Sequence, residues 1–324
     1  MARFARVNSA LQAFFGLITL LSGVLMMWGS VKGEKADIST IGTLSAGAVD
    51  IDASVPSAAD NGKLVVAAGK FVADQQLEDE YLKPGAYLIL RRHVEMYQWT
   101  EEVGSNSSEP RYSQGWHEGE VDFFKFSSPE GHENPVLRSA SVRQVVQSSR
   151  FGGYDGSVLL ESIVKLLPLT LDQSMLKDST LLIEENKIIV PRPGNLESPA
   201  LGDMRVWYEA LPQGDYTVMT KQVDERTLVG ATPSDTLLIR PGLFTAESLS
   251  KAQSSEVRSG VFGMLCFGAI LLFAGMVSIL SPLATNFDLR PRLPFTGGAA
   301  LAVVCAAISC GALAVMSALA LLGS

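Results

Sequence analysis

Three long runs without a charged residue constrain this chain more than any other feature. They cover residues 11–28, 261–280 and 299–322. At a helical rise of about 1.5 Å per residue, each run is long enough to cross a hydrocarbon core of about 30 Å. A surface helix of a soluble domain would carry a polar stripe, and none of these runs has one. The sequence therefore predicts an integral membrane protein with three transmembrane helices.

Arginines beside these runs predict the orientation of the helices. Arg3 and Arg6 precede the first run, and Arg290 and Arg292 lie between the second and third. Positively charged flanks favour the cytoplasmic side. The first run has no small-residue cleavage site after it, so we interpret it as a retained signal anchor. We therefore expect a cytoplasmic N-terminus (1–10), a first transmembrane helix (11–28) and an extracytoplasmic domain (31–258). A second transmembrane helix (261–280), a cytoplasmic loop (281–298) and a third transmembrane helix (299–322) follow.

The region between the first two runs predicts a β-rich domain. Its apolar stretches are short and are bounded by turn signals such as Lys83-Pro84-Gly85, whereas residues 155–176 approximate helical spacing. All three cysteines fall in the apolar runs, so this domain folds without disulfides. The expected fold class is an α+β membrane protein: a β-rich extracytoplasmic domain with a helical insert, anchored by one N-terminal and two C-terminal transmembrane helices.

Two stretches of this domain resemble each other. Residues 86–95 align without a gap on residues 215–224, and a glycine-led strand precedes each copy. This pattern predicts an internal duplication of a β unit, over about 60–127 and 180–245, around the helical segment. The alternative is that any two amphipathic strands look alike.

The stretch "RRHVEMYQW", residues 91–99, holds the densest group of chemically capable side chains. In a strand, alternation puts Arg91, His93, Glu95, Tyr97 and Trp99 on one face. His93 and Glu95 could then share a metal with the other two histidines, which would make the protein a membrane-anchored metal-dependent hydrolase using His93, Glu95, His117 and His132. The ligand spacings of known zinc motifs are absent, so we favour a sheet face of ion pairs and packed aromatics.

Other features narrow the function further. Nucleotide-binding and nucleophile motifs are absent, and the net charge of −8 without a basic run argues against nucleic acid. The apolar runs carry no charge that would mark an ion path. We expect a protein that is not an enzyme and uses no cofactor. The apolar runs are rich in small residues that favour close helix packing and a homo-oligomer within the lipid bilayer, among them Gly263, Gly268, Gly275 and Gly311.

Several stretches resemble the transmembrane protein 43 (LUMA) family. These are "RRHVEMYQWTEE", "GDMRVWYEALP" and "SDTLLIRPGLFTAESL", and the arrangement of the apolar runs is similar too. The motif positions in this sequence are Arg91, Arg92, His93, Val94, Glu95, Met96, Tyr97, Gln98, Trp99, Gly202, Asp203, Arg205, Asp235 and Thr236. The resemblance implies a non-enzymatic membrane organiser that self-associates and binds envelope proteins, such as emerin and lamins in animals. Animal members have three C-terminal spans, whereas two are predicted here, so we expect the two chain ends on opposite sides of the membrane.

The leading hypothesis is a self-associating membrane scaffold that supports complexes of proteins in the same envelope. The resemblance implies the endoplasmic reticulum and inner nuclear membrane, with a lumenal domain, in a eukaryote. In a bacterium it would be the inner membrane, with a periplasmic domain. Asn106 is a glycan acceptor in the eukaryotic case. A further alternative is an envelope sensor or chaperone that binds through an aromatic lobe formed by Trp116 and residues 121–126.

Overall fold

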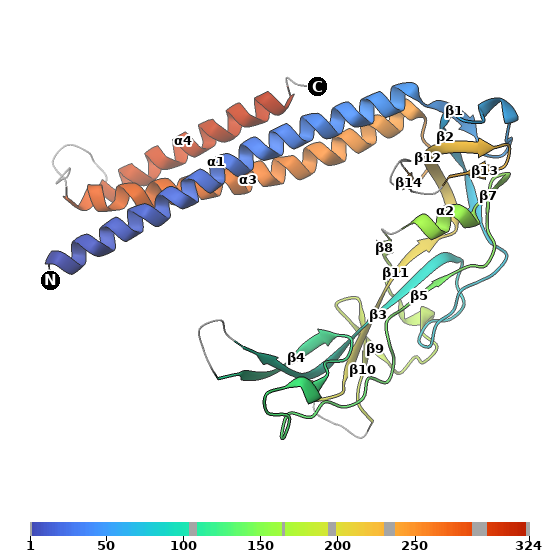
Figure 1. Ribbon diagram of the computed structural model, residues 1–324, viewed down its shortest axis with the longest axis horizontal. Helices are drawn as coiled ribbons and strands as arrows, with labels where there is room; N and C mark the ends of the chain where they lie inside the picture. The colour runs from blue at the N-terminus through green and yellow to red at the C-terminus, as the bar shows by residue number, and fades with distance from the viewer. Residues whose placement is uncertain are drawn as a thin grey trace. The chain divides into compact units, whose positions relative to one another are not determined.

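The computed structural model describes residues 2–103, 109–163, 166–193, 199–229, 237–286 and 297–321. The chain divides into two compact units (Figure 1). The helical unit consists of Met1–Ala48 and Phe244–Ser324, and the β unit is Val49–Leu243. The β-rich domain expected at 31–258 is therefore too wide, because both flanking helices continue well beyond their apolar runs.

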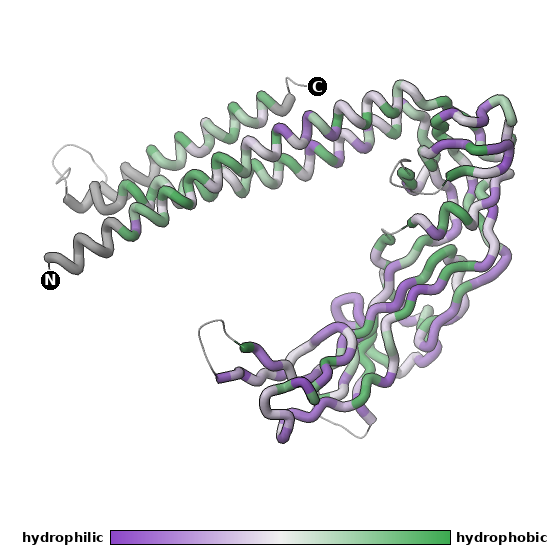
Figure 2. The backbone as a smooth tube through the Cα atoms, in the orientation of Figure 1, coloured by the Kyte–Doolittle hydropathy of each residue, from purple (hydrophilic) through white to green (hydrophobic). Residues whose placement is uncertain are grey.

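The helical unit contains α1 (Ala2–Gly47), α3 (Ala246–Asn286) and α4 (Gly297–Leu321). Two helical stretches, Leu11–Gly47 and Ala246–Leu280, are long and apolar enough to cross a membrane. In α4 the described apolar stretch, Val304–Leu319, is shorter. Of the three expected spans, the described residues thus supply two long ones and a short apolar helix. In Figure 2 green predominates along the middle of α1, and purple segments appear beyond it.

Helices α1 and α3 pack along each other through glycines. A Cβ placed on Gly23 would lie 2.8 Å from the carbonyl oxygen of Gly268, and one on Gly275 would lie 2.8 Å from that of Gly16. These distances are too short for any side chain, so the two backbones are in direct contact. The glycines are seven residues apart on each helix, which keeps them on the side that faces the other helix. The glycines therefore fix how closely the two helices approach.

The helix pair continues past the apolar runs. On α1, Val31 is buried, and Ile38, Ile41 and Leu44 are half-buried at spacings of three to seven residues. This periodicity keeps one side of α1 packed although four of the six residues between Val31 and Ile38 are charged. At the start of α3, the hydroxyl of Thr245 accepts from the backbone N–H of Ser248, and that of Ser248 accepts from the N–H of Thr245. This reciprocal cap explains why α3 begins at Ala246.

The first sheet of the β unit, sheet I, contains seven described strands in the order β1-β2-β6-β7-β13-β12-β14, with β2 also paired to β12. Its core is the antiparallel pair of β2 and β12, which runs in register from Leu64 opposite Lys221 to Phe71 opposite Gly214. The strands are β1 (Val49–Asp52), β2 (Leu64–Val72), β6 (Arg150–Phe151), β7 (Tyr154–Asp155), β12 (Gly214–Asp224), β13 (Thr227–Leu228) and β14 (Leu238–Pro241).

The second sheet, sheet II, is built on the long strand β3. One edge of β3 pairs with β11, and the other pairs first with β5 and then with β4. Beyond β11 follow β10 and β9, and β8 also pairs with β11. The strands are β3 (Tyr87–Glu102), β4 (Arg111–Glu118), β5 (Val142–Val145), β8 (Leu167–Pro168), β9 (Leu182–Glu184), β10 (Lys187–Val190) and β11 (Met204–Pro212).

The helical insert is shorter than expected. Instead of residues 155–176, the helix α2 covers Ser157–Ser162, and short 3-10 turns stand at η1 (Ala58–Asp60), η2 (Phe123–Lys125) and η3 (Gln173–Met175). Beyond α2 the chain is extended, because Leu167 and Pro168 pair with β11 and Leu169 donates to the carbonyl of Tyr208. The spacing of the apolar residues after α2 therefore reflects an extended segment that pairs with β11, and not a helix.

The two similar stretches do not form separate halves. Strands β2 and β12 pair in sheet I, and β3 and β11 pair in sheet II. Each of the two expected copies therefore contributes strands to both sheets. The internal duplication itself stays a prediction.

Candidate functional site

The motif stretch 91–99 forms the middle of β3, and its predicted alternation of faces is confirmed. Arg92, Val94, Met96 and Gln98 are buried, whereas the residues between them are only half-buried. We call the half-buried side the polar face of sheet II; its members on β3 are Arg91, His93, Glu95, Tyr97 and Trp99. Strand pairing brings Glu118 and Trp116 of β4 and Trp207 and Glu209 of β11 to the same face.

His93 links three strands of the polar face. Its Nδ1 lies 3.0 Å from Oε1 of Glu118, and its Nε2 lies 3.1 Å from Oε2 of Glu209. A neutral imidazole can donate through only one nitrogen, while the protonated ring donates through both. The ring also stacks on Trp207, with centroids 5.0 Å apart. Glu209 is further held by Arg91 at 3.3 Å.

Cations and aromatic rings alternate over the rest of this face. Lys187 lies 2.8 Å from Glu95 and sits over the ring of Trp207, 4.5 Å from its centroid. The guanidinium of Arg205 lies 4.0 Å from the centroid of Trp116. Such stacked cation–aromatic pairs contribute roughly 0.5–1 kcal/mol each when partly exposed. The polar face therefore consists of side chains that satisfy one another across strands.

Behind the polar face lies a buried polar network around Asp79. One guanidinium nitrogen of Arg92 lies 3.0 Å from both carboxylate oxygens of Asp79, and the Tyr208 hydroxyl donates to the same carboxylate. Asp79 and Tyr208 are 6% and 0% exposed, so no solvent screens the pair. Burial, and then the hydrogen bond to Asp79, raises the pKa of Tyr208 well above its usual value. This network ties the connection between β2 and β3 to the centre of sheet II.

Gly202 and Asp203 form a turn that leads into β11. Gly202 has a φ of +90°, a conformation that favours glycine. The Asp203 carboxylate accepts from the backbone N–H groups of Arg192 and Ala200 at 2.7 and 2.9 Å. Backbone bonds from this turn also reach Tyr97. These two motif residues thus hold a loop in place, whereas Asp235 and Thr236 lie outside the described residues.

The residues of the expected metal site do not converge. His117 is opposite Met96, so it belongs to the face of β4 opposite the one that carries the partners of His93. His132 instead stacks on Tyr112 with centroids 3.7 Å apart, and its Nδ1 contacts the carbonyl oxygen of Ser128. Within the described ranges, no group of three or more His, Cys, Asp or Glu side chains could hold a metal. The interpretation of His93, Glu95, His117 and His132 as one metal centre is therefore wrong.

The four glycines singled out in the apolar helices have different surroundings. Gly268 and Gly275 contact α1, as described above, whereas a Cβ on Gly263 or Gly311 would meet nothing within 4 Å. Asn106 lies outside the described residues.

Sequence reasoning missed Asp79, Glu118 and Glu209, the carboxylates that hold the motif arginines and His93. Glu118 and Glu209 could have been found only from the pairing of their strands with β3, and Asp79, which lies in a loop, had no signal in the sequence.

Comparison with known proteins identifies the family of this chain. A family model described as transmembrane protein 43 matches residues 96–323. Transmembrane protein 43 of Mus musculus is 30% identical over 86% of this chain and 76% of its own length, and that of Rattus norvegicus is 29% identical over the same shares. A homologue in Drosophila melanogaster is 24% identical over 74% of this chain and 71% of its own. No solved structure matches significantly. With most of its length matched and two helices of membrane-spanning length, the chain is a membrane protein that belongs to the transmembrane protein 43 family.

Proposed function

We propose that this protein is a self-associating membrane scaffold that supports complexes of proteins in the same membrane envelope. The observation that carries the proposal is the outward side of α4. Cys305 and Ser309 of α4 are buried against the other helices, at 0% and 5% exposure. The opposite side of α4 is exposed and carries a stripe of small residues at spacings of four, three and four: Ala307, Gly311, Ala314 and Ala318. Larger exposed side chains border this stripe on one side, namely Val304, Ile308, Val315 and Leu319.

Small residues on an exposed helix side favour association with another helix. In lipid, apolar side chains gain nothing from leaving water, so helices associate through close van der Waals packing, which small residues permit. The other exposed side chains of the helical unit include large ones such as Phe14, Leu25 and Phe262, which suit contact with lipid. The outward side of α4 is therefore where a second copy would pack.

The β unit supports a binding role over a catalytic one. On the polar face of sheet II, His93, Glu95 and Arg91 each contact a polar side chain of another strand within 3.3 Å. A catalytic acid or base needs access to a substrate, and these contacts occupy the groups instead. A sheet whose polar side chains already bind one another suits a scaffold.

The arginines that flank the helices support an orientation of the chain in the membrane. They favour a cytoplasmic N-terminus and a β unit on the opposite side. We propose the endoplasmic reticulum and inner nuclear membrane, with the β unit in the lumen, if the cell is eukaryotic. In a bacterium the equivalent is the inner membrane, with the β unit in the periplasm.

Chemical cross-linking in native membranes, followed by size analysis, tests self-association. The wild-type chain should give dimers or larger products, and the double variant Ala307→Leu/Ala314→Leu should lose most of them because leucine blocks close approach. Ala274→Leu, at an exposed position of α3, is the matched control and should cross-link like the wild type. A wild-type chain that stays monomeric would refute the proposal, as would a double variant that cross-links normally.

A further inference from the structure

The β unit presents an exposed phenylalanine, Phe124, at η2. Phe124 is 79% exposed, and its ring stacks on Phe123 with centroids 4.3 Å apart. A phenyl ring left in water forgoes the favourable free energy that its burial would supply. Folding therefore gives no reason for an aromatic residue at this place, whereas a binding partner would.

The turn that carries Phe124 is firmly held. The Asp122 carboxylate accepts from the backbone N–H of Phe124 at 3.2 Å, which caps the turn. Before it, the backbone N–H of Val121 donates to the side chain of the buried Gln98 at 2.9 Å. After it, Phe126 packs on Tyr112, with centroids 5.9 Å apart. A ring held in one position loses little conformational entropy on binding, which favours its use as an anchor.

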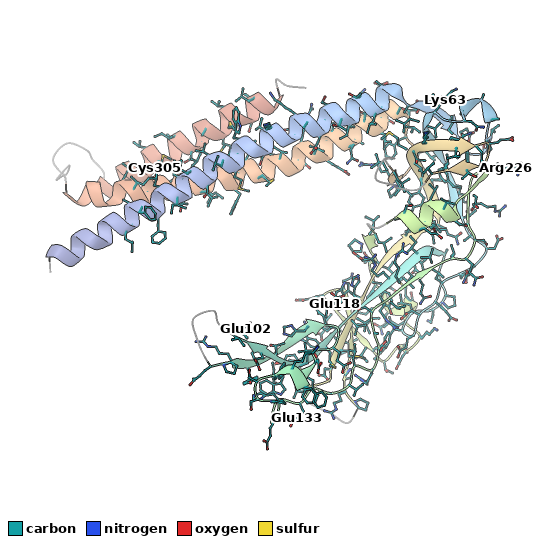
Figure 3. All side chains as sticks on the ribbon, in the orientation of Figure 1. Lys63, Glu102, Glu118, Glu133, Arg226 and Cys305 are labelled. Carbon is teal, nitrogen blue, oxygen red and sulfur yellow. The ribbon has the colours of Figure 1, made fainter. Side chains whose placement is uncertain are left out.

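The chain around this turn is strongly acidic. Between residues 100 and 136 the described residues include eight carboxylates, Glu101, Glu102, Glu109, Glu118, Glu120, Asp122, Glu130 and Glu133, against the two cations Arg111 and Lys125. Lys125 is already paired with Asp122 at 3.3 Å. Figure 3 shows Glu102 and Glu133 at the same end of sheet II. The surroundings of Phe124 therefore carry an excess of negative charge.

Two of these carboxylates are kept ionised by local hydrogen bonds. The side-chain hydrogen bond from Ser127 lowers the pKa of Glu101. A backbone hydrogen bond from Gly131 lowers the pKa of Glu133. Glu101 and Glu133 therefore keep their negative charge to a lower pH than a glutamate without these hydrogen bonds would.

We propose that residues 120–133, which we call the Phe124 tip, are a docking site for a basic segment of a partner protein. An apolar side chain of the segment covers Phe124, and its lysines or arginines face the carboxylates of Glu120, Glu130 and Glu133. Charge decides between a protein segment and a lipid surface, because anionic headgroups would be repelled by the same carboxylates. The inference rests on the proposed scaffold function, for which it names the kind of partner, and it concerns a surface separate from α4.

Peptide binding to the full chain in zwitterionic detergent tests this assignment. The probes are a fluorescent peptide that alternates lysine and arginine with leucine, and a counterpart with glutamate at every charged position. The basic peptide should bind and the acidic one should not. Phe124→Ser should weaken binding about tenfold, since truncating an aromatic anchor costs more than about 1 kcal/mol. Val55→Ser, at a residue 71% exposed in a loop of the same unit, is the matched control and should bind as the wild type does.

A second pair of variants isolates the charge. Glu120→Lys/Glu130→Lys should weaken binding of the basic peptide, and Glu225→Lys, at an exposed turn between β12 and β13, should not. Equal binding of both peptides, or no loss in Phe124→Ser, would overturn the inference. Binding to vesicles rich in phosphatidylserine that depends on Phe124 would also overturn it, in favour of a membrane contact. Each of these results leaves the cross-linking test of self-association unaffected.

Discussion

Arg92 and Asp79 form a buried ion pair in which one guanidinium nitrogen lies 3.0 Å from each carboxylate oxygen. The neighbouring Arg91 points to the other face of β3 and pairs with Glu209, where both side chains are more than a quarter exposed. Two adjacent arginines of one motif therefore have different roles. Arg92 connects sheet II to the preceding loop in the core, and Arg91 contributes to the polar face.

Asp79→Asn should destabilise the β unit strongly. The substitution keeps the size of the side chain but leaves the charge of Arg92, which is 9% exposed, without its buried partner. Breaking a buried pair in this way costs about 3–5 kcal/mol. Denaturant unfolding followed by tryptophan fluorescence measures the loss, because Trp207 and Trp116 lie in sheet II.

Glu80→Gln is the control for this prediction. Glu80 also contacts Arg92, at 3.4 Å, but its side chain is 54% exposed. Exposed pairs contribute about 0–1 kcal/mol, so the variant should unfold close to the wild type. Equal losses in the two variants would show that Asp79 does not dominate the network.

The alternation of β3 was predictable because strand periodicity is a local property of the sequence. Successive side chains of a strand point to opposite faces, and polar and apolar residues alternate from His93 to Met96, so no tertiary information is needed to assign the faces. The partners of that face were not predictable in the same way. Asp79 lies in a loop without periodicity, and Glu209 lies 118 positions away from Arg91. Only the register of β11 against β3 brings the latter pair together.

The length of α1 could not be predicted from hydropathy alone. The run assigned to the first span ends at Trp28, and the helix continues to Gly47. Charged residues such as Lys32 and Lys35 interrupt the apolar run, but they fall on the exposed side of the helix. Hydropathy averaged over a window combines both sides of a helix, so the predicted apolar segment ends where charged residues begin. The side packed on α3 shows only in the spacing of the remaining apolar residues.

Stability of the β unit should fall in alkaline solution, and Tyr216 should contribute to the fall. Burial raises the pKa of Tyr216 from 10.0 to about 12. A raised folded pKa means that the unfolded chain loses its proton first, so the contribution is complete below pH 10 and declines as the pH rises towards 12. One such proton changes the free energy of unfolding by up to about 1.4 kcal/mol per pH unit.

Tyr216→Phe tests this directly. The variant loses the hydrogen bond from the hydroxyl to the carbonyl oxygen of Pro212, so a constant offset from the wild type is expected at neutral pH. Above pH 10 the offset should shrink, because the variant has no phenol to ionise at this position. Free energies of unfolding measured across this range check the prediction. A constant offset at every pH would contradict it.

Gly23→Ala should separate α1 from α3. The new Cβ would lie 2.8 Å from the carbonyl oxygen of Gly268, a backbone atom that cannot rotate away. Overpacking of this kind costs about 1–3 kcal/mol. Thermal unfolding of the helical signal in detergent micelles measures the effect. Gly33→Ala, on the same helix with nothing within 4 Å, should instead stabilise the helix by up to about 1 kcal/mol. Changes of the same sign in both variants would be evidence against glycine-mediated contact.

Glu34→Met should leave the helix pair as stable as before or more stable. Glu34 lies between α1 and α3 and is only 3% exposed. Its Oε1 is 3.9 Å from Nε of Arg258, which is long for an ion pair. In the described part of the chain, Oε2 of Glu34 and Nε of Arg258 are buried without a hydrogen-bond partner. Removing a poorly satisfied buried carboxylate relieves a desolvation cost, so a change between zero and about 4 kcal/mol is expected.

The two members of this pair should respond differently. The side chain of Arg258 is 40% exposed, so after Glu34→Met its guanidinium can turn towards water. After Arg258→Met the carboxylate of Glu34 would remain buried with no opposite charge beside it, and the helix pair should lose stability. Thermal unfolding in micelles compares both variants with Lys32→Met, an exposed control on α1. Equal destabilisation by Glu34→Met and Arg258→Met would mean that the pair stabilises the helices despite its distance. A gain in Glu34→Met alone would mean that Glu34 costs stability, and a role in setting the register of α1 against α3 would then account for its position.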